Sequence, residues 1–185
     1  LSDKLQTILN LYRRGGYLIR TALMDMEFKP LADKMTDVNI NTTSAREHVG
    51  DVERCIRLIK DRCRSVISDL PYRDFLPDQF VIHLLYFVAR MLNAVPNDNG
   101  VSSEYSPKEI VTGQKFDFET QCKVKFGAYV EAHPDRDITN DMKLRAEPCI
   151  ALGPTGNIQG GVNCYSLTTK KILERRSFTR LPMPD

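Results

Sequence analysis

The hydrophobic pattern of this chain changes near residue 118, and that change most limits how the chain can fold. Before it, apolar residues recur at helical spacing over long stretches, as in residues 45–70 and 77–93. After it, the apolar runs are short and Gly, Pro, Asn or Asp separate them, which is typical of strands joined by turns. The sequence therefore predicts an α/β domain over residues 1–115 and an all-β domain, a small antiparallel barrel, over residues 116–185.

Four shorter elements are expected ahead of the first long helix. Leu5, Ile8, Leu9 and Tyr12 lie on one stripe of a helix, and Gly15-Gly16 would end it. The four elements are a helix over 3–14 with Ser2 as N-cap, a strand over 17–24, a helical turn over 30–34 and a strand over 38–42.

The two long helices differ in how their apolar residues are arranged. The helix over 45–70 has one apolar face, made of Val52, Ile56, Ile59, Cys63, Val66 and Ile67. The helix over 77–93 is apolar on most sides, so we expect it to be buried within a domain or paired with another chain. A third, short helix is expected after Ser106-Pro107, with Ser106 as N-cap and Gly113 as its end.

Charged residues form a narrow stripe beside the apolar face of the 45–70 helix. At about 100° per residue, Arg57, Lys60 and Arg64 lie within about 40° of Glu53. Such a stripe could place a carboxylate next to a row of cations along a phosphate backbone. Glu53 and Arg57 are also an ordinary i,i+4 surface pair, and from the pattern alone a solvated helix face is the simpler interpretation.

Composition excludes several classes of protein. The chain has 26 Lys and Arg against 24 Asp and Glu, and a net charge of +2 does not by itself indicate a nucleic-acid binder. No apolar stretch reaches the ~18–20 residues of a membrane span, so no membrane partner is expected. Five scattered cysteines predict reduced thiols in an intracellular protein. Cys55 and Cys63 are interpreted as small core residues, and His83 as a hydrogen-bonded core histidine.

Several short segments resemble the integrase region of Copia-type retrotransposon polyproteins. His48–Arg54 is similar to the Gly-x-x-Glu-Arg signature that carries the last acidic residue of retroviral-type integrases. The segment Leu23–Phe28 resembles the Asp-x-Glu-Phe region after the strand of the second catalytic aspartate. Ser106–Gly113 resembles the Ser-Pro-x-x-Leu-x-x-Gly element downstream of that core. Three later segments resemble successive parts of the barrel that follows: Phe126–Val130, Cys149–Gly153 and Leu167–Lys171.

The resemblance implies a partial ribonuclease-H-like integrase core followed by a small Src-homology-3-like β-barrel. It implies DNA integration by metal-dependent strand transfer, with two Mg²⁺ or Mn²⁺ ions held by carboxylates. Asp25 would be the second carboxylate and Glu53 the third, while Arg54, Arg57, Lys60 and Arg64 would bind DNA. The partners implied are element ends and target DNA, with a homo-oligomer in the complete enzyme, located in the nucleus or a virus-like particle.

The departures from the family pattern leave alternatives open. Met24 and Met26 replace the glycines beside the aspartate, and only 28 residues separate Asp25 from Glu53, so Glu27 and Asp33 are alternative strand carboxylates. The first catalytic aspartate is expected before residue 1, and this chain alone is expected to be inactive. The second hypothesis is a domesticated, non-catalytic module that binds nucleic acid or a protein. A plain α+β scaffold without a DNA role is a third.

Overall fold

Residues that lie close together form two compact units in the computed structural model of the chain. Unit 1 is Leu1–Asp61 with Leu92–Lys115, and unit 2 is Arg62–Met91 with Phe116–Asp185. The structure describes residues 2–43, 50–74, 76–98, 100–134, 142 and 144–184. Proximity does not say which segment folds alone, so the domain boundary between residues 115 and 116 stays a prediction.

Unit 1 begins with helix α1, Ser2–Arg14, which confirms the helix expected over 3–14. Ser2 lies inside this helix and is not its N-cap. Leu9 is buried with Met35 and Val38, and this small core is bordered by Leu5, Ile19, Ala22 and Ile40. Gly15 follows the helix, and Gly16 after it adopts the left-handed conformation, with a φ of 84°. The predicted glycine stop is therefore confirmed.

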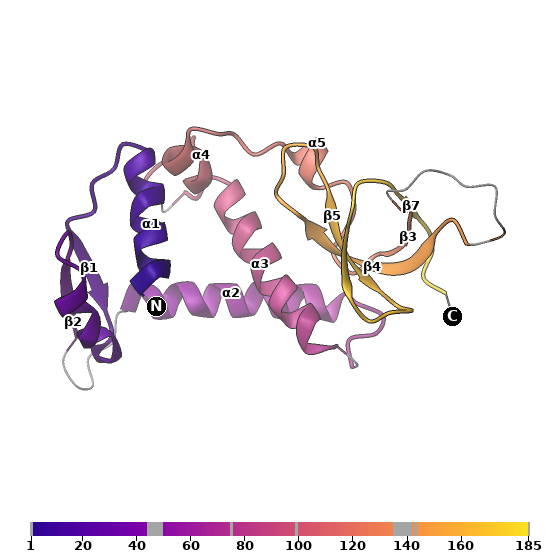
Figure 1. Cartoon of the computed structure of the whole chain (residues 1–185), viewed down its shortest axis with the longest axis horizontal. Coiled ribbons are helices and arrows are strands. Elements are labelled where there is room, and N and C mark those ends of the chain that lie inside the picture. Colours follow the sequence, from indigo (N-terminus) through magenta and orange to yellow (C-terminus); the bar gives the residue numbers. More distant parts are fainter. Residues whose placement is uncertain are drawn as a thin grey trace. The chain divides into compact units, whose positions relative to one another are not determined.

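Two short parallel strands follow in unit 1 (Figure 1). Strand β1, Thr21–Met24, pairs with β2, Asn39–Thr42, in a register that places Met24 opposite Thr42. The 3-10 helix η1, Met26–Lys34, connects them and contains the predicted turn over 30–34. Strand β1 starts at Thr21, four residues later than predicted, although the Arg20 carbonyl already accepts from the Asn39 amide of β2 at 2.9 Å.

Helix α2, Gly50–Ser68, is the long helix that the sequence predicts. The first predicted residues, 45–49, lie outside the described part of the chain and include His48 and Val49 of the integrase-like motif. Val52 and Ile56 are 49% and 46% exposed, and Cys63 is only 8% exposed. The expected burial of the apolar face is therefore wrong at its N-terminal end, and Cys55 is exposed as well. Periodicity decides which side chains share a face, but burial needs another element packed against it.

The short helix α4, Pro107–Thr112, has the predicted caps. The Ser106 hydroxyl accepts a hydrogen bond from the Glu109 amide at 3.2 Å, and Gly113 closes the helix with a φ of 68°. Both caps are confirmed because they depend only on local sequence.

Unit 2 contains helix α3, Asp78–Ala94, over most of its length. Phe80, Leu84 and Val88 form its buried stripe. The opposite side stays exposed, although its residues are also apolar: Val81, Ile82, Leu85 and Tyr86. No helix in the described ranges combines the length and the apolar character that crossing a bilayer requires.

A five-stranded antiparallel sheet forms the rest of unit 2, after a short helix α5, Phe118–Gln121. The strands are β3 (Tyr129–Ala132), β4 (Glu147–Pro154), β5 (Val162–Ser166), β6 (Ile172–Arg175) and β7 (Phe178–Arg180). Their order is β6-β5-β4-β3-β7, so the last strand returns to pair with the first. The short apolar runs of the sequence predict four strands, over 124–130, 148–152, 162–167 and 171–175. The first starts only at Tyr129, because Gly127, with a φ of 80°, turns the chain just before it. The other three are confirmed as β4, β5 and β6.

Both faces of β4 are buried, and each face has a different cover. Cys149 and Ala151 belong to the core cluster of the sheet, together with Val124, Val130, Ala132, Val162 and Cys164. Ile150 points the other way because side chains alternate along a strand, and it pairs with Tyr165 of β5. The Tyr165 ring lies 5.0 Å from the Phe80 ring, centroid to centroid, so helix α3 covers this second face.

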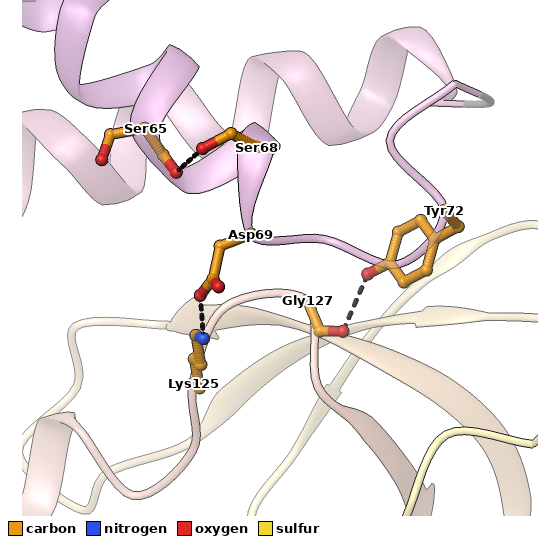
Figure 2. A network of polar contacts seen from close by, with 6 residues as sticks. All are labelled: Ser65, Ser68, Asp69, Tyr72, Lys125 and Gly127. Carbon is orange, nitrogen blue, oxygen red and sulfur yellow. Dashed lines mark hydrogen bonds and ion pairs between the residues drawn. The ribbon is translucent and has the colours of Figure 1, made fainter.

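Polar contacts also attach the helical part of unit 2 to the sheet (Figure 2). The Tyr72 hydroxyl donates to the Gly127 carbonyl at 2.8 Å, and Asp69 forms an ion pair with Lys125. A Cβ atom on Gly127 would lie 2.2 Å from Leu70 Cδ2, so only glycine allows this close approach. At the end of β4, the Pro154 carbonyl accepts a hydrogen bond from Arg90 of α3 at 2.5 Å.

Candidate carboxylate pair and nucleic-acid interface

Asp25 lies at the carboxyl end of the parallel strand pair. It follows β1 directly, with φ −66° and ψ 157°, and its side chain does not cap η1. The Thr43 hydroxyl, which follows β2, donates to Asp25 Oδ1 at 3.5 Å. The carboxyl edge of a parallel sheet is where α/β proteins commonly place ligand-binding groups. Asp25 is exposed there, in a position suited to contact a ligand.

Glu53 lies in the first turn of α2, with Asp51. Carboxylates in this position are stabilised by the positive end of the helix dipole. Asp51 is paired with Arg54 at 3.0 Å, and both side chains are largely exposed. An exposed pair of this kind contributes little to stability, so Arg54 is held only weakly by Asp51.

Three further cations project from α2. Arg57, Lys60 and Arg64 are exposed, as the sequence predicted for a solvated or DNA-facing side of the helix. Their spacing of three and four residues places them on one side of a regular α-helix. The distance between Arg57 and Lys60 along the axis is about 4.5 Å at 1.5 Å per residue, so neighbouring cations can reach successive phosphates.

The carboxylate oxygens of the candidate site are suitable ligands for a hard divalent cation, but too few of them are grouped together. Carboxylate oxygens such as those of Asp25 and Glu53 are what Mg²⁺ and Mn²⁺ prefer. In the described part of the chain, however, no three His, Cys, Asp or Glu side chains are grouped closely enough to hold a metal ion. The alternative carboxylates Glu27 and Asp33 lie on η1 and do not complete such a group.

Thr43 is the one member of this site that the sequence analysis did not single out. The position of Thr43 could have been predicted from the sequence, because two parallel strands that end together place the residues after them side by side. Asp25 after β1 and Thr43 after β2 are such a pair, and the Thr43 amide also donates to the Met24 carbonyl at 3.0 Å.

The remaining sequence interpretations concern unit 2. Burial lowers the pKa of His83, which is half-buried on α3, so its imidazole favours the neutral form. Burial also raises the pKa of the Cys149 and Cys164 thiols to about 11 and about 12, which makes them unreactive near neutral pH. The five cysteines are free thiols. The glycine-rich stretch over 153–161, which the sequence suggests is a hairpin loop, spans the end of β4 and the loop over 155–161 that leads to β5.

No protein-family model matches the chain, and a comparison with curated proteins finds no similar sequence. What the fold and the site define is a mixed α/β and antiparallel β protein with an exposed carboxylate at a parallel strand edge and a basic helix.

Proposed function

We propose that this chain is part of a ribonuclease-H-like integrase core with the following Src-homology-3-like barrel, and that it binds DNA along α2. The observation that carries the proposal is the order of three features in unit 1. Asp25 directly follows a strand of a parallel pair, Glu53 lies in the first turn of a long helix further along, and Arg57 and Lys60 are exposed on that helix. This order is what the motif resemblance implies.

The sheet of unit 2 supports the second half of the proposal. The four strands β3 to β6 follow one another as neighbours, and β7 returns to β3. That order suits a small barrel whose first strand pairs with both its second and its last. The barrel-like motif Cys149–Gly153 lies within β4, and Leu167–Lys171 lies in the turn between β5 and β6.

In the complete enzyme, a pair of divalent cations would supply charge stabilisation at the reacting phosphate. Asp25 and Glu53 would be two of the oxygen ligands, and the proposal needs a third carboxylate beyond the two. What the residues of this chain do is hold the DNA. Arg57, Lys60 and Arg64 neutralise phosphates, and Arg54 adds a cation at the same end of α2 as Glu53.

A non-catalytic module that binds nucleic acid is the second candidate. The described ranges hold no group of three metal-ligating side chains, which is all that this candidate requires and which the integrase proposal also expects of this chain alone. Both candidates predict DNA binding through α2, and they differ in strand transfer. When a strand with the first aspartate is supplied, the integrase proposal expects Mg²⁺-dependent joining of a DNA end that Glu53→Gln abolishes. The module proposal expects no joining in either protein.

The DNA-binding step is tested by fluorescence anisotropy with a labelled DNA duplex of about 30 base pairs over a range of salt concentrations. Changing Arg57, Lys60 and Arg64 together to Ala should weaken binding about equally for unrelated sequences. It should also reduce the slope of log affinity against log salt by about 0.9 for each phosphate that is no longer neutralised. Glu53→Gln should leave metal-free binding unchanged or slightly stronger, because it removes a negative charge near phosphate.

A matched control removes the same number of positive charges outside α2. Lys4, Lys29 and Lys34 are exposed lysines outside α2. Their triple Ala variant has the same net charge as the α2 variant, so it should keep most of the parent's affinity and salt slope. If the two triple variants are weakened equally in affinity and in slope, binding depends on net charge alone and the α2 interface is wrong.

A further inference from the structure

Unit 1 contains an aromatic pocket that is separate from the carboxylates and from the basic side of α2. The cavity has a volume of about 300 Å³. Three tyrosines line it with a proline and two small polar residues: Tyr12, Tyr17, Tyr105, Pro107, Asn97 and Ser102. It is small for a ligand pocket, since such pockets commonly span about 300–1,000 Å³.

The turn after α1 explains how two of the tyrosines reach the same cavity. Gly16 adopts a left-handed conformation, the Tyr17 amide donates to the Tyr12 carbonyl at 3.0 Å, and the Gly16 amide donates to the Arg13 carbonyl at 3.1 Å. These two bonds define a Schellman motif, in which the residues at the positions of Tyr12 and Tyr17 come into contact. The sequence Tyr-Arg-Arg-Gly-Gly-Tyr therefore builds one wall of the pocket.

A close backbone approach holds that wall against α4. A Cβ atom on Gly15 would lie 2.1 Å from the Val111 carbonyl oxygen, so the end of α1 touches the backbone of α4. The opposite wall is held by Ser102, whose hydroxyl accepts from the amides of Glu104 and Tyr105, each at 3.1 Å. The pocket is thus formed by turns with defined hydrogen bonds.

The two chain segments that line the pocket, residues 12–17 and 97–111, carry equal numbers of positive and negative residues. Every residue that lines it is uncharged. The ionisable residues of the lining segments are three cations, Arg13, Arg14 and Lys108, and three anions, Asp98, Glu104 and Glu109. A phosphate-bearing ligand would gain no net attraction here, whereas an uncharged ligand with an apolar surface would lose none.

We propose that this pocket binds a proline-containing segment of a partner protein in the polyproline II conformation. Such a segment presents apolar rings and fully exposed carbonyl groups, and it enters grooves lined by aromatic side chains at low entropic cost. The tyrosine rings and Pro107 supply the apolar walls. The hydroxyls of Tyr17 and Tyr105, which are exposed, are donors that proline carbonyls need. The proposal is independent of DNA binding by α2.

The test uses the whole chain and a dye-labelled decaproline peptide, with a Gly-Ser decapeptide as the ligand control. Decaproline should bind saturably and the Gly-Ser peptide should not. Tyr105→Ala should weaken decaproline binding at least about tenfold, as removal of an aromatic anchor does. Tyr86→Ala is the matched control, because Tyr86 is an exposed tyrosine of α3 outside the pocket, and it should leave the affinity unchanged.

Two charge variants distinguish binding of the proposed peptide from binding of a single-stranded nucleic acid. Val101 lines the pocket but is 96% exposed, so the fold tolerates a charge there. Val101→Glu and Val101→Lys should weaken decaproline binding about equally. For labelled oligo-dT, Val101→Lys would instead strengthen binding and Val101→Glu would weaken it. Absence of saturable decaproline binding, equal weakening in the Tyr105 and Tyr86 variants, or Tyr105-dependent binding of oligo-dT alone would each overturn the proposal.

Discussion

The two units differ most in what covers their apolar side chains. In unit 2 the core cluster of the sheet includes Val130, Cys149 and Cys164, and none of the three has measurable exposure. In the described part of unit 1 the core cluster consists of Leu9, Met35 and Val38. Several large apolar residues of unit 1 are exposed, among them Ile8, Leu11, Leu18 and Leu23. Unit 1 therefore has less hydrophobic stabilisation to offset its chain entropy.

This difference has a topological origin. The sheet of unit 2 is antiparallel, joined mainly by short turns, and α3 covers its second face. Among the described residues the sheet of unit 1 has two parallel strands, and parallel strands are found almost entirely in sheets buried on both faces. We therefore expect unit 2 to contribute most of the stability of the chain. We expect the exposed apolar side chains of unit 1 to be the ones that pack against other protein segments.

The largest effect on stability is expected when the sheet of unit 2 is separated from α3. A shortened chain of residues 116–185 lacks Phe80 and Leu84, each of which contributes about 2–5 kcal/mol when buried. It also lacks the Tyr72 and Arg90 hydrogen bonds. We expect it to show no cooperative thermal transition by circular dichroism, whereas residues 62–185 should unfold cooperatively.

The same experiment decides between the predicted domain boundary and the observed contacts. A barrel that is a domain by itself, as the change in pattern near residue 118 suggests, would unfold cooperatively as residues 116–185. Its midpoint would then match that of the whole chain, and the cover supplied by α3 would contribute little to stability.

A smaller effect is expected from two substitutions on one turn of α3. Leu84 is 1% exposed and Ile82 is 50% exposed. Leu84→Ala should lower the free energy of unfolding by about 2–5 kcal/mol, and Ile82→Ala by less than about 1 kcal/mol. Urea unfolding monitored by circular dichroism measures both. An equal decrease for Ile82→Ala would mean that the outer side of α3 is covered in solution, and a dependence on protein concentration would identify a second copy as the cover.

How much the sequence could predict follows from how local each feature is. Helix α4 was predictable at both ends, since Ser106 and Gly113 act within one or two turns. The start of β3 was not, because Gly127 is required by its contact with Leu70, which is distant in sequence. The same holds for α2, where periodicity gave the face shared by Ile56 and Cys63, while only tertiary packing decides that Cys63 is the buried one. The contact between Asp25 and Thr43 lies between these cases, because it needs only the parallel pairing of two recognised strands.

The smallest effect that we predict concerns the cap of α4, which holds one side of the tyrosine pocket in unit 1. Ser106 is 3% exposed and its hydroxyl accepts from the Glu109 amide. In Ser106→Ala that amide loses its partner in a site with little access to water, so the free energy of unfolding should fall by about 1 kcal/mol. Ser103→Ala is the control, because Ser103 is exposed and lies outside the helix, and it should change stability by no more than about 0.5 kcal/mol. Hydrogen exchange of the backbone amides of residues 108–112 can separate a local from a global effect. Faster exchange confined to α4 and the Tyr105 segment would show that unit 1 opens independently, whereas equal acceleration in β4 would show that both units unfold together and would contradict the comparison.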